Sequence, residues 1–177
     1  MRINLPNPEL FSRLVLDVTG IELDSPVHGV TTDSRDFEQG DFYLALCGER
    51  TDGHNYLPGL ESLGCTSALV SKKNDNLSSL KQIVVGDTIT TIGKIANLWQ
   101  NQFQIPTIAI TGTNGKTTTK DLLSHIFGAS MNVHYTEKNF NTSIGLPLTI
   151  LMQTKTHSIS ILEMGANQPG DISYLCK

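Results

Sequence analysis

The feature that most constrains this chain is a short apolar run that leads through a glycine-rich turn into a helical pattern. The run is PTIAI (106–110), the turn is TGTNG (111–115), and a segment with helical spacing begins at Lys116. We expect the run to be a buried parallel strand. A strand that delivers such a turn to a helix N-terminus can bind phosphate, because glycine lets backbone N–H groups curl around the oxygens. The sequence therefore predicts an α/β fold with a phosphate-binding loop.

This loop matches the pattern G-x-x-x-x-G-K-[ST], except that Ile110 stands where the first glycine is expected. In such a loop Lys116 reaches the β- and γ-phosphates of ATP, and the Thr117 hydroxyl is a ligand for Mg²⁺. A polar turn that contains Gly-Lys by chance is the alternative. The predicted ATP-binding residues are Gly112, Thr113, Asn114, Gly115, Lys116, Thr117 and Thr118.

The metal of a phosphate-binding loop needs an acidic partner, usually at the end of a neighbouring strand. Glu163 closes the apolar run ISIL (159–162). We therefore predict Thr117 and Glu163 as metal ligands, and Lys116 and Glu163 as catalytic residues. The alternative is an ordinary acid that caps the next turn. Asp121 and Glu137 are weaker candidates, and an acid at position 121 is favourable near a helix N-terminus in any case.

Strand-like and helical segments alternate along the chain, which predicts parallel sheets with right-handed crossovers. We expect a small α/β domain over residues 1–86 and part of a P-loop parallel-sheet domain over residues 87–177, with the boundary near residues 84–90. Three strands in the second domain would leave an uncovered edge, so we expect a truncated chain. The expected strands are 28–33, 41–46, 67–71, 82–86, 106–110, 132–135 and 158–165. The expected helices are 10–18, 54–64, 92–103, 143–152, one that begins at Lys116, and the opening of another in QPGDISYLCK (168–177).

Composition argues against several classes of function. The net charge of −4 disfavours non-specific nucleic-acid binding, and no apolar run reaches the roughly 18–20 residues of a membrane span. The three cysteines have no CxxC spacing, which fits reduced thiols in the cytoplasm. The five histidines share no metal-ligand spacing, and we expect His54 to order a loop rather than to transfer protons. We expect a cytoplasmic monomer without an integral membrane segment.

Four stretches resemble a known family. TGTNGKTTTK (111–120) resembles the phosphate loop of the Mur ligases, ATP-dependent enzymes of peptidoglycan synthesis whose loop also lacks the first glycine. Residues 29–56 are similar to the N-terminal substrate module of that family. KNFNTSIGLPLTIL (138–151) and LEMGANQPGDISYL (162–175) are similar to the branch that adds D-alanyl-D-alanine to UDP-N-acetylmuramoyl-tripeptide, although histidine is expected where Gln168 stands.

The resemblance implies a UDP-sugar-binding domain over residues 1–86 and a partial ATP-binding domain over residues 87–177, with a further C-terminal domain absent. It implies ATP and Mg²⁺ as cofactors, and UDP-N-acetylmuramoyl-tripeptide and D-alanyl-D-alanine as substrates, joined through an acyl phosphate. It places Ser34 and Arg35 at the uridine diphosphate end of the substrate. Near the substrate or the transferred phosphate it places Asn139, Asn141 and Thr142, with Asn167 as a further candidate.

Several alternatives stay open at this point. Asp33-Ser34-Arg35 can form a turn with a solvated arginine, and Thr142 or Ser143 can simply cap the next helix. The acceptor can differ, as in a Mur ligase that adds the third residue or in a folylpolyglutamate synthase, which has a similar loop. The 177-residue chain can also be a binding fragment that is inactive alone.

Overall fold

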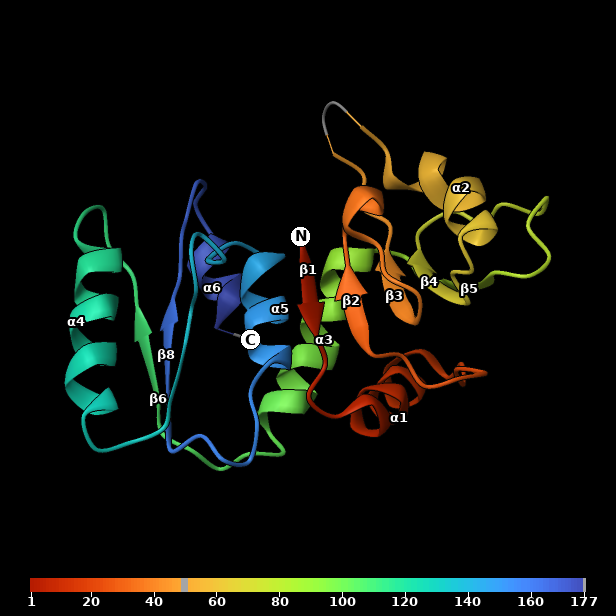
Figure 1. Cartoon of the computed structure of the whole chain (residues 1–177). Helices are drawn as coiled ribbons and strands as arrows, with labels where there is room; N and C mark the ends of the chain where they lie inside the picture. Colours follow the sequence, from red (N-terminus) through yellow and green to blue (C-terminus); the bar gives the residue numbers. More distant parts are fainter. Residues whose placement is uncertain (49–50, 177) are drawn as a thin grey trace. The chain divides into compact units, whose positions relative to one another are not determined.

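The structure is a computed structural model that describes residues 1–48 and 51–176. The chain forms two compact units, Met1–Ile95 and Ala96–Lys177, which we describe separately (Figure 1). Each unit is built on one sheet in which most or all strands run parallel. The predicted α/β fold class is therefore confirmed.

The sheet of the first unit has five strands in the order of the chain. All neighbouring pairs are parallel except the first, which is antiparallel. That first strand is absent from the sequence-based expectation. It is only three residues long, and the Arg2 side chain anchors it by donating from Nε and Nη2 to Asp41 at 2.7 and 3.0 Å. The strands are β1 (Arg2–Asn4), β2 (Gly29–Thr31), β3 (Asp41–Leu44), β4 (Ser67–Val70) and β5 (Lys81–Val84).

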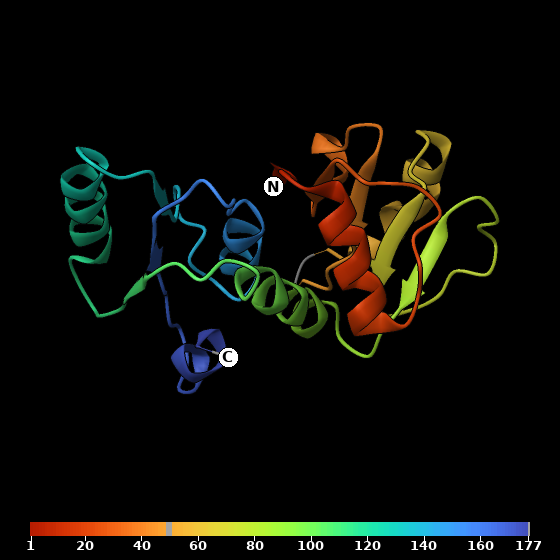
Figure 2. The ribbon, with the colours of Figure 1, turned by 90° about the horizontal axis from the view of Figure 1, so that it is seen from below.

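Helices cover both faces of this sheet. Side chains along a strand alternate between the two faces, so consecutive residues of one strand pack against different helices. On one face, α1 (Pro8–Thr19) sets Phe11 against Phe42 of β3, with ring centroids 5.4 Å apart. On the other face, α2 (Leu57–Ser62) packs near Tyr43, the next residue of the same strand. Figure 2 shows the two helices on opposite sides of the strands.

The boundaries of these helices follow from local chemistry. The Asn7 Oδ1 atom accepts the backbone N–H of Leu10 and caps α1, which ends where Gly20 has a φ of 73°. The expected helix over 54–64 is divided. Its first turn is the 3₁₀ helix η2 (Gly53–Tyr56), and the α-helix begins only at Leu57, just before Pro58.

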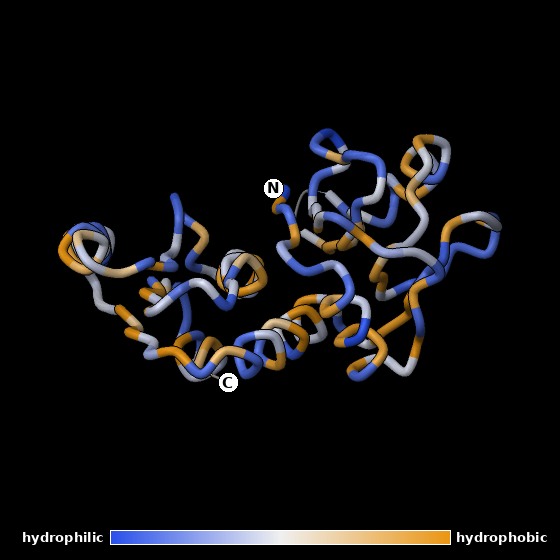
Figure 3. Tube along the Cα trace, turned by 60° about the horizontal axis from the view of Figure 1, so that its bottom comes forward, coloured by the Kyte–Doolittle hydropathy of each residue, from blue (hydrophilic) through white to orange (hydrophobic). Residues whose placement is uncertain are grey.

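Helix α3 (Thr88–Gln100) carries the predicted apolar stripe. Ile92, Ile95, Ala96 and Trp99 are all buried, and hydrophobic and hydrophilic positions alternate around the turns of this helix (Figure 3). The Trp99 ring N–H donates to the Gln153 carbonyl at 3.0 Å, so this aromatic side chain belongs to the core, as expected.

The second unit has a three-stranded parallel sheet in the order β6-β8-β7. Helices α4 and α5 lie on opposite faces of the sheet in both ribbon views (Figures 1 and 2). Every residue of α5 and of the central strand β8 is buried. The elements are β6 (Thr107–Ile110), α4 (Lys116–Gly128), β7 (Val133–Tyr135), α5 (Gly145–Leu151), β8 (Ile159–Glu163) and α6 (Asp171–Leu175).

The expectation of a buried strand at 106–110 is wrong. The strand forms as β6, but Thr107 and Ala109 are exposed, and Ile108 and Ile110 are only half-buried. The physical reason is its place at the edge of the sheet, where one side pairs with β8. A run of apolar residues predicts a strand, but its burial depends on what covers it.

Along the described residues, no helix combines the length and the apolar character needed to cross a membrane.

Candidate functional site

The glycine-rich turn lies between the end of β6 and the start of α4. Gly112 and Gly115 have φ angles of 149° and 74°, which side-chain-bearing residues rarely adopt, so the turn depends on glycine at both positions. Lys116 begins α4, and its Nζ donates to the Gly112 carbonyl at 2.7 Å, so its side chain folds back over the turn. The turn, including Thr113 and Asn114, is exposed, as are Thr117 and Thr118 of α4, whereas Lys116 is half-buried.

Glu163 lies at the edge of the sheet where this turn begins. Its strand β8 pairs with β6 in a parallel register that sets Ile110 beside Glu163, and the Met164 N–H donates to the Ile110 carbonyl at 2.8 Å. The Glu163 residue is 2% exposed. Its Oε2 atom accepts from the Thr117 hydroxyl at 2.9 Å, and its Oε1 atom accepts from the Asn141 amide at 2.7 Å.

This pair of oxygen atoms fits a magnesium ion. Adjacent ligands of octahedral Mg²⁺, with bonds of about 2.0–2.1 Å, lie about 2.9 Å apart, which is the separation of Thr117 Oγ1 and Glu163 Oε2. Within the described part of the chain, the buried Glu163 carboxylate is held by neutral donors and forms no ion pair. A buried carboxylate without a cationic partner is costly, and a divalent cation would remove that cost.

The segment 138–142 brings one of its three predicted site residues to Glu163. Asn141 donates to the carboxylate, and its carbonyl accepts the Gly165 N–H at 2.8 Å. The Thr142 hydroxyl oxygen accepts the Gly145 N–H at 3.2 Å, but the N-cap position of α5 is held by Ile144, so neither Thr142 nor Ser143 is the N-cap residue that the alternative predicted. Asn139 is exposed on the preceding turn, where Lys138 has a φ of 51°.

A small hollow lies beside this segment in the second unit. Asn167, a further predicted site residue, lines it together with Thr142 and Gly165. The Asp171 carboxylate at the start of α6 accepts the N–H groups of Asn167 and Gln168 at 2.8 and 2.9 Å, and these bonds lower the pKa of Asp171. The position where histidine was expected, Gln168, therefore contributes its backbone to the turn.

Ser34 and Arg35 lie in the first unit, in the 3₁₀ helix η1 (Ser34–Asp36) that follows β2. The Arg35 guanidinium donates to both carboxylate oxygens of Asp33, from Nε at 2.9 Å and from Nη2 at 2.6 Å. This pairing raises the pKa of Arg35 and lowers that of Asp33. Arg35 is 85% exposed, so its remaining N–H groups face solvent at the carboxyl end of a parallel strand.

The two weaker acidic candidates, Asp121 and Glu137, have different contacts from those of Glu163. Asp121 forms an ion pair with Lys120 at 2.7 Å, and Glu137 is exposed. Thr136 and Lys120 are not among the site residues predicted from the sequence. Thr136 Oγ1 accepts the Glu163 N–H at 2.9 Å, and the Lys120 Nζ donates to the Thr136 carbonyl at 2.8 Å. A second lysine one helical turn after Lys116, in the sequence GKTTTK, was the available signal.

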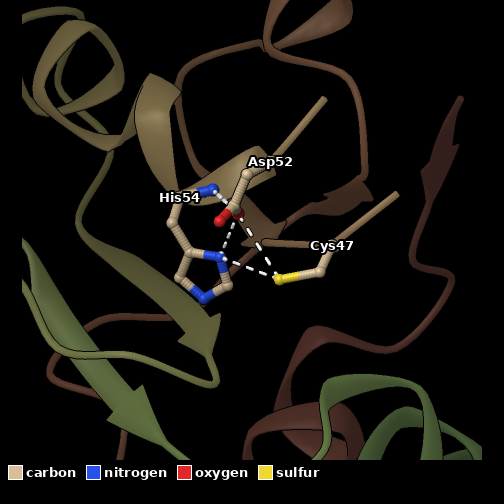
Figure 4. Close-up of side chains that lie close together, drawn as sticks. All are labelled: Cys47, Asp52 and His54. Atoms are coloured by element: carbon tan, nitrogen blue, oxygen red, sulfur yellow. Dashed lines mark hydrogen bonds and ion pairs between the residues drawn. The ribbon is translucent and has the colours of Figure 1, made fainter. Parts of the chain in front are cut away.

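A second cluster of chemically active side chains lies in the first unit. Cys47, Asp52 and His54 point toward one another (Figure 4), with His54 Nδ1 at 2.5 Å from Asp52 Oδ1 and 3.7 Å from Cys47 Sγ. His54 Nε2 accepts the backbone N–H groups of Ser71 and Lys72 at 2.9 and 3.3 Å. The proton of the neutral ring therefore sits on Nδ1 and is donated to Asp52. The His54 backbone N–H, which donates to Asp52 Oδ1 at 2.9 Å, and this ring N–H together lower the pKa of Asp52 to about 2.

This arrangement disfavours a metal ion at the cluster. An ion on His54 Nδ1 would displace the proton that Asp52 accepts, while Nε2 would still face two N–H donors. His54 instead joins the loop after β3 to the end of β4, in line with the loop-ordering role expected from the sequence.

Two family models match most of the chain. Residues 26–102 match the model described as "Mur ligase family, catalytic domain", and residues 110–177 match the model described as "Mur ligase middle domain". The UDP-N-acetylmuramoyl-tripeptide–D-alanyl-D-alanine ligase of Synechocystis sp. is 36% identical over 162 residues, which are 91% of this chain.

Solved structures of ligases with similar names also resemble this chain. A UDP-N-acetylmuramoylalanyl-D-glutamyl-2,6-diaminopimelate–D-alanyl-D-alanyl ligase from Acinetobacter baumannii is similar over 94% of this chain, with a TM-score of 0.85 and 33% identity. The MurF ligase from Thermotoga maritima, solved in complex with ADP, is similar over 83% of the chain, with a TM-score of 0.76 and 33% identity. The chain spans 36% of the length of the Synechocystis relative, 38% of the Acinetobacter chain and 34% of the Thermotoga chain.

Proposed function

This chain belongs to the Mur ligase family, and from that premise we propose that it carries part of an ATP-dependent ligase of peptidoglycan synthesis. The proposed reaction joins UDP-N-acetylmuramoyl-tripeptide to D-alanyl-D-alanine through an amide bond, the substrate pair in the name of the Synechocystis relative. The observation that carries the proposal is the Thr117–Glu163 oxygen pair beside an exposed glycine-rich turn. Because the chain spans about a third of its relatives, we assign it nucleotide and precursor binding, and expect no amide formation by the chain alone.

The nucleotide phosphates would bind at the turn and the first residues of α4. The backbone N–H groups of 112–118 and the partial positive charge at the helix N-terminus favour an anion there. Lys116 would exchange its bond to the Gly112 carbonyl for a phosphate oxygen. Thr117 and Glu163 would hold Mg²⁺, which supplies charge neutralisation at the phosphates.

The proposed chemistry has two steps. A carboxylate oxygen of the tripeptide attacks the γ-phosphorus of ATP, the bond to the bridging oxygen breaks, and ADP leaves with that electron pair. The amine of D-alanyl-D-alanine then attacks the acyl phosphate carbon, loses a proton, and phosphate leaves as the amide forms. The first step brings two anions together, so Lys116 acts by positioning and neutralising charge.

We assign precursor-binding residues in each unit by itself. We assign the uridine diphosphate end to Ser34 and Arg35, since the exposed N–H groups of Arg35 suit a diphosphate. We assign the reacting end to Asn139, Asn141 and Thr142, because Asn141 already contacts Glu163. We also place the reaction in the cytoplasm, where ATP is available and where the free thiols of the described chain stay reduced, and take the acting species to be a monomer.

A calorimetric titration of the 177-residue chain tests the proposal. We expect saturable binding of ADP in the presence of Mg²⁺, and of UDP-N-acetylmuramoyl-tripeptide in preference to uridine monophosphate. Arg35→Ala should weaken precursor binding and leave ADP binding unchanged. Binding of neither ligand would contradict the proposal. Equal affinity for the tripeptide precursor and uridine monophosphate would contradict the assignment of the peptide end.

A further inference from the structure

Lys120 is buried in a place where lysine is rarely found. Among the 13 residues of α4, all of which the structure describes, Lys120 is the one that is buried, and it is 3% exposed. Lysine is almost never fully buried unless its ammonium group has partners. The phosphate-binding role assigned to Lys116 does not account for this second lysine one turn later.

The partners of Lys120 connect α4 to the chain just after β7. Its Nζ donates to the Thr136 carbonyl at 2.8 Å, pairs with the Asp121 carboxylate at 2.7 Å, and lies 5.4 Å from the centre of the Tyr135 ring. Asp121 is 61% exposed, so it can balance the charge without being buried itself. The ammonium group of Lys120 therefore already has partners within the protein, and it is not free to bind a phosphate.

Thr136 connects Lys120 to Glu163. It is fully buried, its N–H donates to the Ile161 carbonyl at 3.0 Å, and its Oγ1 accepts the Glu163 N–H at 2.9 Å. Thr136 is thus held to β8 through two of its atoms and to α4 through its carbonyl.

The contacts close into a ring. Lys120 bonds Thr136, Thr136 bonds the backbone of Glu163, and the Glu163 carboxylate bonds Thr117, which lies on the same helix as Lys120. Positions 117 and 120 are three residues apart, so they share a face of α4. A helix attached at two points of one face cannot rotate or slide without breaking one of these bonds.

We propose that Lys120 and Thr136 are positioning residues that hold Thr117 Oγ1 and Glu163 Oε2 at the spacing a magnesium ion requires. The inference rests on the metal-binding part of the proposed function. Residues behind the direct ligands of a metal commonly change its affinity by about 10- to 100-fold when they are lost. The ring predicts an effect of that kind at Thr136, which touches neither nucleotide nor metal.

The test uses matched variants of Thr136 in the 177-residue chain. Thr136→Val keeps the shape and removes the oxygen that accepts the Glu163 N–H, whereas Thr136→Ser keeps that oxygen. The probe is Mn²⁺ alone, a paramagnetic ion that accepts the same oxygen ligands as Mg²⁺ and broadens the NMR signals of nearby residues. ADP binding with and without Mg²⁺, and the thermal midpoint, are measured on the same samples.

We expect Mn²⁺ to broaden the backbone signals of Thr117 and Glu163 selectively. In Thr136→Val this should require about tenfold more Mn²⁺, with Thr136→Ser close to the wild type. ADP affinity without metal should stay within about twofold. Lys120→Met should shift the Mn²⁺ requirement in the same direction as Thr136→Val, which gives a second test if that variant does not fold.

Equal Mn²⁺ requirements in Thr136→Val and Thr136→Ser would overturn the inference, even if Thr136→Val has a lower thermal midpoint. The absence of any Mn²⁺ effect at Thr117 and Glu163 in the wild type would overturn it as well. If Mn²⁺ binds as expected and ADP does not, the proposed nucleotide function fails while the positioning role of Lys120 and Thr136 stands.

Discussion

At the scale of single residues, the candidate site depends on the strand register that sets Ile110 beside Glu163. In the general phosphate-loop pattern the position of Ile110 is a glycine. Here it is the last residue of β6 and its carbonyl accepts the Met164 N–H, so the turn begins only after the strand pairing is complete. The departure from glycine at Ile110 therefore has a structural explanation. Ile110 extends the pairing of β6 with β8, and this pairing brings Glu163 to Thr117.

Lys116→Ala should lower the affinity of the chain for ADP in the presence of Mg²⁺ by about 10- to 100-fold. The reason is the loss of a charge-assisted hydrogen bond to phosphate, worth roughly 1.5–3 kcal/mol. Calorimetry measures the affinity, and Lys155→Ala, which removes an exposed lysine of the same unit, is the matched control. Unchanged ADP affinity in Lys116→Ala would remove Lys116 from the phosphate site.

Arg2→Met should destabilise the first unit by about 3–5 kcal/mol, because it leaves the carboxylate of Asp41 buried without its cation. The side chain of Asp41 is 0% exposed, and that of Arg2 is 17% exposed. The control is Lys73→Met, since the pair between Lys73 and Asp75 is exposed and should contribute less than about 1 kcal/mol. Urea unfolding followed by circular dichroism measures both. Similar losses in the two variants would contradict the special role of Arg2.

At the scale of elements, α5 holds the segment that carries Asn141. The helix begins at Gly145, and a Cβ atom there would lie 2.6 Å from the Phe140 Cα and 2.7 Å from the Phe140 carbonyl carbon. Backbone therefore passes against backbone at this point, and only glycine allows it. The close approach ties the start of a fully buried helix to the turn that presents Asn141 to Glu163.

Gly145→Ala should therefore cost about 1–3 kcal/mol of stability by overpacking, and should weaken the Mg²⁺ dependence of ADP binding as Asn141 moves. Gly128→Ala is the matched control. Gly128 ends α4 with nothing within 4 Å of the added methyl group, so this variant should be neutral or stabilised by up to about 1 kcal/mol. Differential scanning calorimetry compares them. A Gly145→Ala variant as stable as Gly128→Ala would show that the contact relaxes freely.

Sequence patterns predicted the long elements better than the short ones. Periodicity over many residues predicted α1 and α3, and alternating strands and helices predicted the parallel pairing of β2 to β5. β1 was missed because three residues carry no measurable period, and its stability depends on a partner 39 positions away. The exposure of β6 was missed for the same reason, because burial is decided by neighbours in space.

At the scale of the whole molecule, a buried histidine makes stability depend on pH. His134 is 6% exposed, and its ring lies 5.0 Å from that of His157. Burial lowers the pKa of His134 from 6.5 to about 4, and it also lowers the pKa of His157. Between these values the unfolded chain binds a proton that the folded chain does not. The stability from neutral His134 is therefore complete above about pH 6.5 and is lost as the pH falls toward 4.

The expected loss over this range is about 3 kcal/mol in the free energy of unfolding. Urea unfolding at a series of pH values between 7.5 and 4.5 measures it, and His134→Phe should flatten most of the slope. His125→Phe is the control, because His125 is exposed on α4. The lowered pKa values of Asp33 and Asp52 act at lower pH, below the usual range of a carboxyl group. An equal slope in the wild type and in His134→Phe would contradict this account.

By itself the sequence determined the α/β class, the glycine-rich turn with Lys116 and Thr117, and Glu163 as the acid at the end of a strand. These features are local, because each depends on residues within one strand, turn or helix. Only the tertiary structure decided that Asn141 reaches Glu163, that the Thr142 hydroxyl accepts the Gly145 N–H, and that Lys120 and Thr136 complete a ring around the site. Those contacts join residues from separate elements, and such contacts follow from strand order, register and burial, which no single segment encodes.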